Sequence, residues 1–84
     1  MPTPEILELA RRLVIDGSLP DRLPTVTLGG SSAGVICAVC AQAIERGKVE
    51  IELHWQEGGA DRILNMHPTC HAAWLVALRP LITS

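Results

Sequence analysis

Near the start of the chain, apolar and polar residues alternate with the period of a helix. The pattern predicts a helix over residues 3–17. Thr3 is a typical N-cap, Pro4 suits the first helical position, and Gly17 can adopt the left-handed conformation that ends many helices. We expect the apolar side to pack on the rest of the protein, with a second copy or a partner protein as the alternative. That side comprises Ile6, Leu9, Ala10, Leu13 and Val14, and Leu7 and Ile15 broaden it.

A less regular stretch follows this helix. Residues 18–34 are predicted to form a loop with one short strand over 26–28, because Pro20 and Pro24 interrupt any helical pattern. Residues 29–34 are rich in glycine and predict a flexible connector. They lack the spacing of the glycine-rich loops that bind phosphate, so we expect no nucleotide site there.

Strict alternation of apolar and polar residues over 49–55 predicts a half-buried strand. Residues 57–61 are predicted to form a turn, and residues 62–66 a short return strand that completes a β-hairpin. The predicted buried face carries Val49, Ile51, Leu53 and Trp55, and the predicted wet face carries Glu50, Glu52 and His54.

A second helix is predicted from Pro68 to about residue 78, with His67 at its N-cap and its end set by Pro80. Residues 72–78 are apolar on every side of this helix. A helix of this kind is either fully buried or partly covered by another chain.

The strongest chemical signal is a pair of short motifs, Cys37-x2-Cys40 and His67-x2-Cys70. Two ligands three positions apart converge on one ion in a tight turn, and positions i and i+3 at a helix start lie on the same side. Three thiolates and one imidazole suit tetrahedral Zn²⁺ and leave no open coordination position. We therefore predict one structural zinc ion, with iron as the less favoured metal, because a Rieske centre would need a second His at a different spacing and a ferredoxin would need four Cys.

Composition supports a metal. The chain has 84 residues, and its hydrophobic fraction of 48% includes two Trp but no Phe or Tyr. Domains this small bury a modest share of their surface and often depend on a metal or disulfides. The cysteine count of three is odd, and neither a signal peptide nor a membrane-length apolar run is visible. We therefore expect a cytoplasmic protein, in which clustered thiols indicate metal binding.

Two other histidines complicate the site. His71 follows Cys70 directly and is the alternative fourth ligand, although adjacent residues converge on an ion less well than His67 and Cys70 do. His54 falls on the wet face of its strand, where a solvated side chain is the simplest expectation.

The stretch from Cys37-Ala-Val-Cys40 through a hairpin to His67-Pro-Thr-Cys70 resembles the treble-clef class of zinc fingers. Its ligand spacing, and Trp74 four residues after Cys70, are similar to the first finger of LIM domains. The run over residues 37–52 additionally resembles small uncharacterised bacterial proteins with one such finger. The chain departs from this pattern by carrying Ala41 where a glycine often follows the second Cys, and by lacking a second finger. The resemblance implies zinc at the matching positions and a structural or protein-binding role.

Together these features predict a single α+β domain over residues 1–84. It would consist of a helix over 3–17, a loop and short strand over 18–34, and a treble-clef zinc finger over 35–79 with a knuckle, a β-hairpin and a C-terminal helix.

We expect a structural zinc protein that serves as a protein-interaction or regulatory module, as a homodimer or with a partner bound through Leu7, Ile15 or the 72–78 segment. A filled coordination shell and the absence of HExxH, GxSxG and deaminase signatures argue against an enzyme. His54 is the only candidate for the catalytic histidine of nuclease relatives of the treble clef. A thiol-based sensor is a further alternative.

Nucleic-acid binding is a weaker alternative because the formal net charge is −2 and stacking Phe or Tyr residues are absent. Between Cys37 and Cys70, five acids outnumber three bases. The basic residues that would have to group in space are Arg11, Arg12, Arg46, Lys48 and Arg62.

Overall fold

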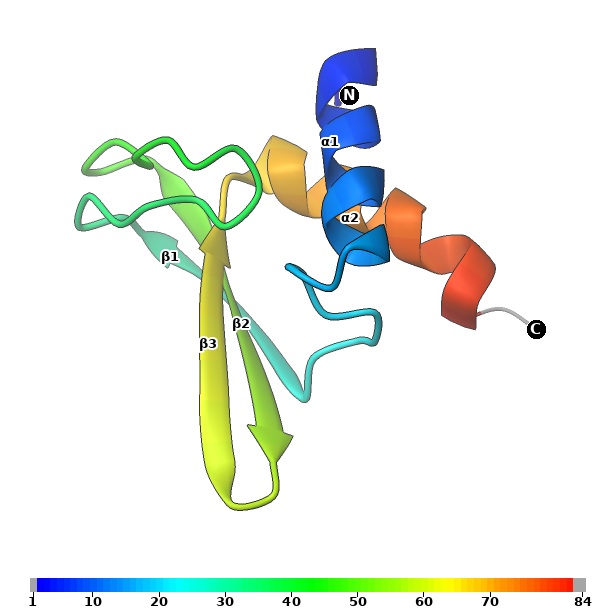
Figure 1. The fold of residues 1–84 in the computed structure, drawn as a ribbon. Coiled ribbons are helices and arrows are strands. Elements are labelled where there is room, and N and C mark those ends of the chain that lie inside the picture. The colour runs from blue at the N-terminus through cyan, green and yellow to red at the C-terminus, as the bar shows by residue number, and fades with distance from the viewer. Residues whose placement is uncertain (1, 83–84) are drawn as a thin grey trace.

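The computed structural model describes residues 2–82, apart from the side chains of Glu57 and Ile82. Five elements follow one another: α1 (Pro4–Ile15), β1 (Val26–Ser31), β2 (Val49–Glu57), β3 (Ala60–Met66) and α2 (Pro68–Ile82). The strands form one antiparallel sheet in the order β1-β2-β3, and both helices lie on one side of it (Figure 1). The predicted α+β class is confirmed.

Helix α1 begins and ends as its sequence predicts. Thr3 is the N-cap, and its hydroxyl accepts a hydrogen bond from the backbone N–H of Ile6 at 3.3 Å. At the other end Gly17 has φ +85°, a left-handed conformation that costs glycine little. Ala10 and Val14 are buried at the centre of the apolar side, whereas Ile15 is 85% exposed.

The sheet is larger than predicted. Residues 29–31, predicted as part of a flexible connector, instead form the second half of β1, so that prediction is wrong. Gly29 pairs with Ile51, Gly30 with Glu50 and Ser31 with Val49. Low intrinsic strand propensity is overridden here because β2 offers a continuous antiparallel partner.

The hairpin between β2 and β3 is tighter than predicted. Both strands extend through the expected 57–61 turn and leave only Gly58 and Gly59 between the pair Glu57 and Ala60. The two glycines have φ of +55° and +87°. Positive φ at both central residues matches the strand twist and is typical of a two-residue hairpin turn.

Helix α2 also extends further than predicted, because it continues through Pro80 to Ile82. Its start is as expected: the His67 carbonyl accepts from the N–H of His71 at 2.8 Å, which places His67 at the N-cap. A proline inside a helix removes one N–H donor, but in the last turn only a single intrahelical bond is lost. No helix within residues 2–82 has both the length and the apolar character required for crossing a membrane.

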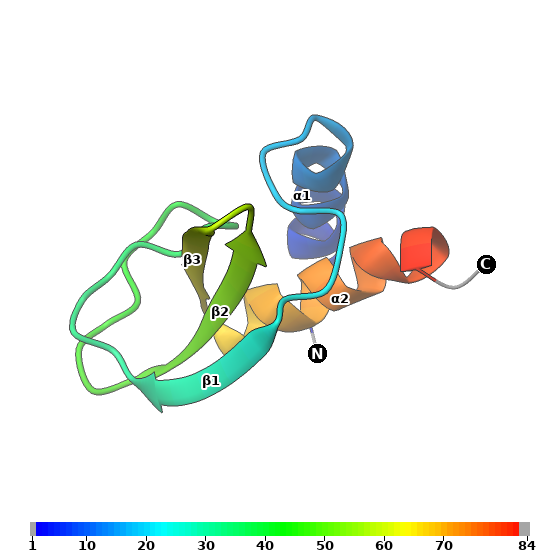
Figure 2. The same cartoon turned by 90° about the horizontal axis from the view of Figure 1, so that it is seen from below.

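The position of α2 explains why its residues are apolar on more than one side. This helix contacts α1 as well as β2 and β3, and α1 crosses it beside the sheet (Figure 2). Both tryptophans lie in the resulting core, with ring centroids 5.8 Å apart at an interplanar angle of 83°. The largest fully buried side chains are Trp55, Trp74, Ile44, Leu53, Met66, Leu78 and Cys37.

The loop between α1 and β1 is fixed by these tryptophans. The Trp74 indole N–H donates to the Pro20 carbonyl and the Trp55 indole N–H to the Arg22 carbonyl, both at 3.1 Å. A buried indole N–H needs an acceptor, and here both acceptors belong to one loop. Leu19 and Pro20 are buried in consequence.

Candidate metal centre

The structure brings together the four residues whose spacing predicted a metal site. One side-chain donor atom from each of Cys37, Cys40, His67 and Cys70 lies within 4.8 Å of the other three. Cys37 and Cys70 are buried, and Cys40 and His67 are half-buried. The cluster lies where the loop before β2 meets the junction of β3 and α2, at the upper end of β3 in Figure 1.

The first pair of cysteines lies in a tight turn. The Cys37 N–H donates to the Gln42 carbonyl at 2.9 Å, and the Ala41 N–H donates to the Cys37 carbonyl at 3.0 Å. An isolated bridge pairs Ile36 with Ala43. To close this turn, Ala41 adopts φ +62°, and it is the one non-glycine residue with positive φ among the described residues.

Two hydrogen bonds hold the turn against the second pair. The Ala38 N–H donates to the Asn65 carbonyl at 2.8 Å, which joins the turn to the end of β3. The His67 N–H points to the Cys37 sulfur at an N···S distance of 3.5 Å. The first of these bonds joins backbone groups and the second joins the backbone of His67 to the Cys37 side chain, so both the backbone and one cysteine hold the two motifs together.

The donor separations fit one tetrahedral ion. The His67 Nδ1 atom lies 3.4 Å from the Cys40 sulfur and 3.9 Å from the Cys70 sulfur. With Zn–S bonds of about 2.3 Å and Zn–N bonds of about 2.0–2.1 Å, the edges of a tetrahedron are about 3.5–3.8 Å long. Donor atoms this close together are positioned to hold a single ion, and three sulfurs with one nitrogen are a typical structural zinc set.

The cluster is electrostatically prepared for a cation. Burial raises the pKa of Cys37, but the backbone N–H groups of Cys40, His67 and Val39 outweigh burial and lower that pKa to about 7. Hydrogen bonds of this kind stabilise a thiolate and orient it as a ligand. In contrast, burial and the neighbouring Cys37 and Cys40 raise the pKa of Cys70. Neighbouring thiolates repel one another, so a bound cation would favour the charged form of the clustered cysteines.

The two remaining histidines lie outside this group. His71 packs its ring 6.0 Å from that of Trp74, and burial lowers its pKa. The cluster of donor atoms contains His67 and does not include His71, so its geometry favours His67 as the fourth ligand. His54 lies on the opposite sheet face from Leu53 and Trp55, with its Nε2 atom 3.4 Å from Glu52 Oε1.

A buried serine supports the site and was missed by sequence analysis. Ser32 is 5% exposed, and its hydroxyl donates to the Ile44 carbonyl at 2.7 Å and accepts from the Gly34 N–H at 3.0 Å. It thereby joins the two ends of the segment that contains the cysteine turn. Ser32 lies in a run of small polar residues, so nothing in the sequence distinguished it from its neighbours.

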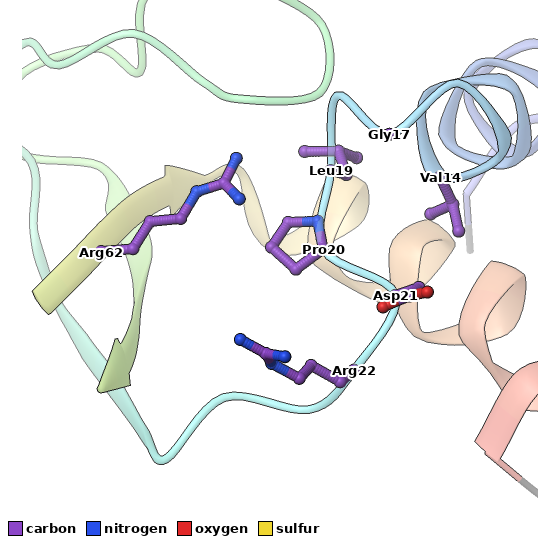
Figure 3. Close-up of a pocket in the computed structure, with 7 residues that line it drawn as sticks. All are labelled: Val14, Gly17, Leu19, Pro20, Asp21, Arg22 and Arg62. Carbon is purple, nitrogen blue, oxygen red and sulfur yellow. The ribbon is translucent and has the colours of Figure 1, made fainter. Parts of the chain in front are cut away.

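A cavity of about 270 Å³ lies between the end of α1, the following loop and β3. Arg22 and Arg62 extend their guanidinium groups into the space on one side of Pro20, and Asp21 lies on the other side of Pro20 in this view (Figure 3). Arg62 donates to the Ser18 carbonyl at 3.3 Å. This hydrogen bond joins β3 to the loop that the tryptophans also hold.

The residues predicted to bind a partner are divided between core and surface. Leu7 packs against the core, and Ala73, Trp74, Ala77 and Leu78 are buried within α2. Ile15 remains at the surface. It lines an apolar groove of about 200 Å³ between α1 and α2, together with Arg11, Val14, Ala77, Pro80 and Leu81.

Fold and site define a small α+β protein with a Cys3His cluster positioned to hold one metal ion. Comparisons with protein-family models, curated proteins and solved structures found no match to this chain.

Proposed function

We propose that this protein binds one structural Zn²⁺ through Cys37, Cys40, His67 and Cys70 and acts as a zinc-stabilised protein-interaction module. The proposal depends on a single observation, the convergence of four donor atoms within 4.8 Å of one another. When bound, the ion would neutralise the clustered thiolates and link the cysteine turn to the start of α2. This arrangement of turn, hairpin and helix supports assignment to the treble-clef class.

The number of protein ligands at the site favours an interaction role over an enzymatic one. Four protein ligands fill a tetrahedral shell, whereas catalytic zinc retains an open position for water or substrate. Of the two cavities described above, neither is lined by a cluster residue or by His54. Substitution of His54 by Ala with loss of a hydrolytic activity would support the enzymatic alternative instead.

The basic residues give little support to nucleic-acid binding. Arg11 and Arg12 lie on α1, Lys48 lies just before β2, and Arg62 pairs with Trp55 near the other end of β2. At about 3.3 Å per residue, the backbones of Lys48 and Arg62 are on the order of 20 Å apart. A patch that tracks a phosphate backbone needs basic groups on one continuous surface.

Metal analysis of the purified protein tests the zinc proposal directly. We expect one zinc per chain, and we expect Co²⁺ substitution to give the visible absorption of a tetrahedral thiolate site. His67→Ala should lose the metal, whereas His71→Ala is the matched control and should retain it. The proposal would be contradicted if the purified protein contained no stoichiometric metal, unfolded cooperatively and showed no change in unfolding when a chelator was added.

The sensor alternative makes a different prediction for the same sample. Mild peroxide would release zinc reversibly if the thiolates responded to oxidant. For a structural site we expect zinc to stay bound at peroxide concentrations that oxidise a free exposed thiol.

A further inference from the structure

Within residues 2–82, no strand pairs with the outer edge of β1. β1 pairs with β2 in an unbroken register from Val26–His54 to Ser31–Val49. Just beyond it, the Ser32 N–H donates to the Lys48 carbonyl at 2.8 Å. Because successive N–H groups of a strand point to opposite sides, Thr27, Gly29 and Ser31 direct their N–H and C=O groups away from β2. These groups form the free edge of β1.

The two edges of the sheet differ in protection. At the β3 edge, the Asn65 carbonyl already accepts from the Ala38 N–H of the cysteine turn. The β1 edge has the sequence Val-Thr-Leu-Gly-Gly-Ser, and all six residues are exposed. Exposed edges are normally protected by charged residues, proline or a covering segment. β1 itself contains no charged residue and no proline, so its edge can accept another strand.

The sheet face beside this edge combines apolar and acidic character. Val26 and Leu28 are 44% and 48% exposed. They share a face with Glu52, which pairs with Leu28, and with Glu50, which pairs with Gly30. The Glu50 Oε2 atom is shielded from water and has no hydrogen-bond partner among the described residues. A carboxylate in this state would gain from a cationic donor.

Gly30 opens a path to that carboxylate. An added strand would lie two strand spacings from β2, about 9–10 Å away. Gly30 has no side chain to block the space between them, so a long basic side chain opposite Gly30 could lie across β1 toward Glu50. Apolar side chains opposite Val26 and Leu28 would cover these two exposed residues.

We propose that the free edge of β1 binds an extended segment of a partner protein as a fourth strand. The segment would place apolar residues opposite Val26 and Leu28 and a Lys or Arg opposite Gly30. A second copy of β1 would bring no cation to Glu50, so charge complementarity favours a different protein. The inference names the partner surface of the proposed interaction module and rests on that proposed function.

Synthetic peptides of about nine residues provide the probe. The first alternates Val or Leu with Thr and carries one Lys at the position expected to lie opposite Gly30, and the second has Glu in place of that Lys. Titrated into zinc-loaded protein, the Lys peptide should shift the amide resonances of Thr27, Gly29 and Ser31 and slow their hydrogen exchange. The Glu peptide should bind about tenfold more weakly because it brings a like charge to Glu50.

Gly29 offers a matched pair of variants. Its φ is not in the left-handed region, and nothing lies within 4 Å of the position that a Cβ would occupy. Since its N–H points away from β2, Gly29→Pro removes an edge donor without breaking the β1–β2 ladder. We expect Gly29→Pro to lose at least about tenfold in peptide affinity, because it also blocks close approach of the added strand. Gly29→Ala should stay within about twofold of the wild type.

Glu50→Gln tests separately the attraction between the Glu50 carboxylate and the Lys of the peptide. In this variant the preference for the Lys peptide over the Glu peptide should largely disappear, while backbone pairing continues. Each variant is first shown to hold one zinc per chain with unchanged near-ultraviolet circular dichroism. A failure of strand binding is thereby distinguished from a failure of the zinc proposal.

Three results would overturn the inference. The first is equal binding of the peptides to wild type and Gly29→Pro. The second is a set of peptide-induced shifts confined to the groove between α1 and α2. The third is concentration-dependent protection of the β1 amides without peptide, which would make a second copy the occupant.

Discussion

Two ends of this small protein are held together by different means. At the metal end, formed by Cys37, Cys40, His67 and Cys70, short backbone bonds and four side-chain donors surround one point. At the tryptophan end, Trp55 and Trp74 pack edge to face and donate to the loop carbonyls of Pro20 and Arg22. The metal end groups ionisable side chains, and the tryptophan end groups large buried apolar side chains.

The difference shows how a chain without Phe or Tyr can stabilise two parts of its structure by different interactions. Buried aromatic rings supply large apolar area, and the only two in this chain are both at one end. The metal end shares one core cluster with these rings but adds no Trp of its own, so we expect a bound ion to be its second source of stability. Helix α2 joins the ends, because Cys70 and Trp74 are one turn apart on it.

Removing one ligand should have the largest effect on this comparison. Cys70→Ser replaces a buried thiolate, and we expect loss of stoichiometric zinc. Structural zinc contributes roughly 10–16 kcal/mol in finger peptides, against about 5–15 kcal/mol for the stability of a whole domain. The variant should therefore unfold, with loss of the near-ultraviolet circular dichroism of the tryptophans.

Wild type treated with a strong chelator is the control for that loss and should reach the same spectrum. If Cys70→Ser lost zinc but kept its tryptophan signal and a cooperative transition, the tryptophan end would be independent of the metal end. Acid should act in the same direction as the chelator, because protons compete with the ion for the thiolates as the pH falls.

The next largest effect is expected from the tryptophans. Trp74→Ala removes a side chain that is 0% exposed and leaves the Pro20 carbonyl without its donor. Truncation of a buried Trp typically lowers the free energy of unfolding by about 3–5 kcal/mol. Zinc stoichiometry should remain at one per chain, as measured by metal analysis alongside denaturant unfolding.

Trp55→Phe and Trp74→Phe sharpen this test, because each removes an indole donor but retains a ring. The Trp74 hydrogen bond is buried and that of Trp55 is partly buried, so Trp74→Phe should cost more. Equal losses from the two variants would show that the loop carbonyls find other donors.

The sequence predicted the site better than it predicted the sheet. The four metal-site residues were identified from two short motifs whose convergence depends on local geometry. The caps of α1 and the alternation in β2 are local signals as well, and both led to correct elements. Residues 29–31 and Pro80 were misassigned because local propensity opposes the structure, and tertiary pairing or helix-end position overrides it.

The hydrogen bonds of Trp55, Trp74 and Ser32 could not be predicted for a different reason. Their bonds to the carbonyls of Arg22, Pro20 and Ile44 each join residues 12 or more positions apart, and no residue type or spacing marks the partner carbonyl. The treble-clef resemblance did point to one detail. It identified the position after Cys40 as one that often carries Gly, and the structure finds Ala41 there with φ +62°.

A smaller loss is expected from Ser32→Ala, which acts on the framework of the metal end. The variant removes the hydroxyl that bonds Ile44 and Gly34 while zinc remains bound. Loss of a buried hydrogen-bond partner costs about 1–3 kcal/mol. Ser31→Ala, at an exposed neighbouring position, should change the midpoint of thermal unfolding little. Equal midpoints for the two variants would mean that Ser32 does not hold the cysteine turn.

The smallest effect is expected to be a gain. Ala41→Gly relieves a left-handed backbone that costs an L-residue about 1–2 kcal/mol, against about 0.5–1 kcal/mol of additional chain entropy for glycine. The net gain of roughly 0.5–1 kcal/mol should raise Tm by a few degrees in a domain of this size, measured at fixed excess zinc. Ala43→Gly makes the same chemical change two residues later, where φ is not positive and Ala43 pairs with Ile36. That control should lower Tm, because glycine there adds entropy cost without relieving strain. If both variants lowered Tm equally, the cysteine turn would hold no backbone strain, and the stability of the metal end would depend on its ligands alone.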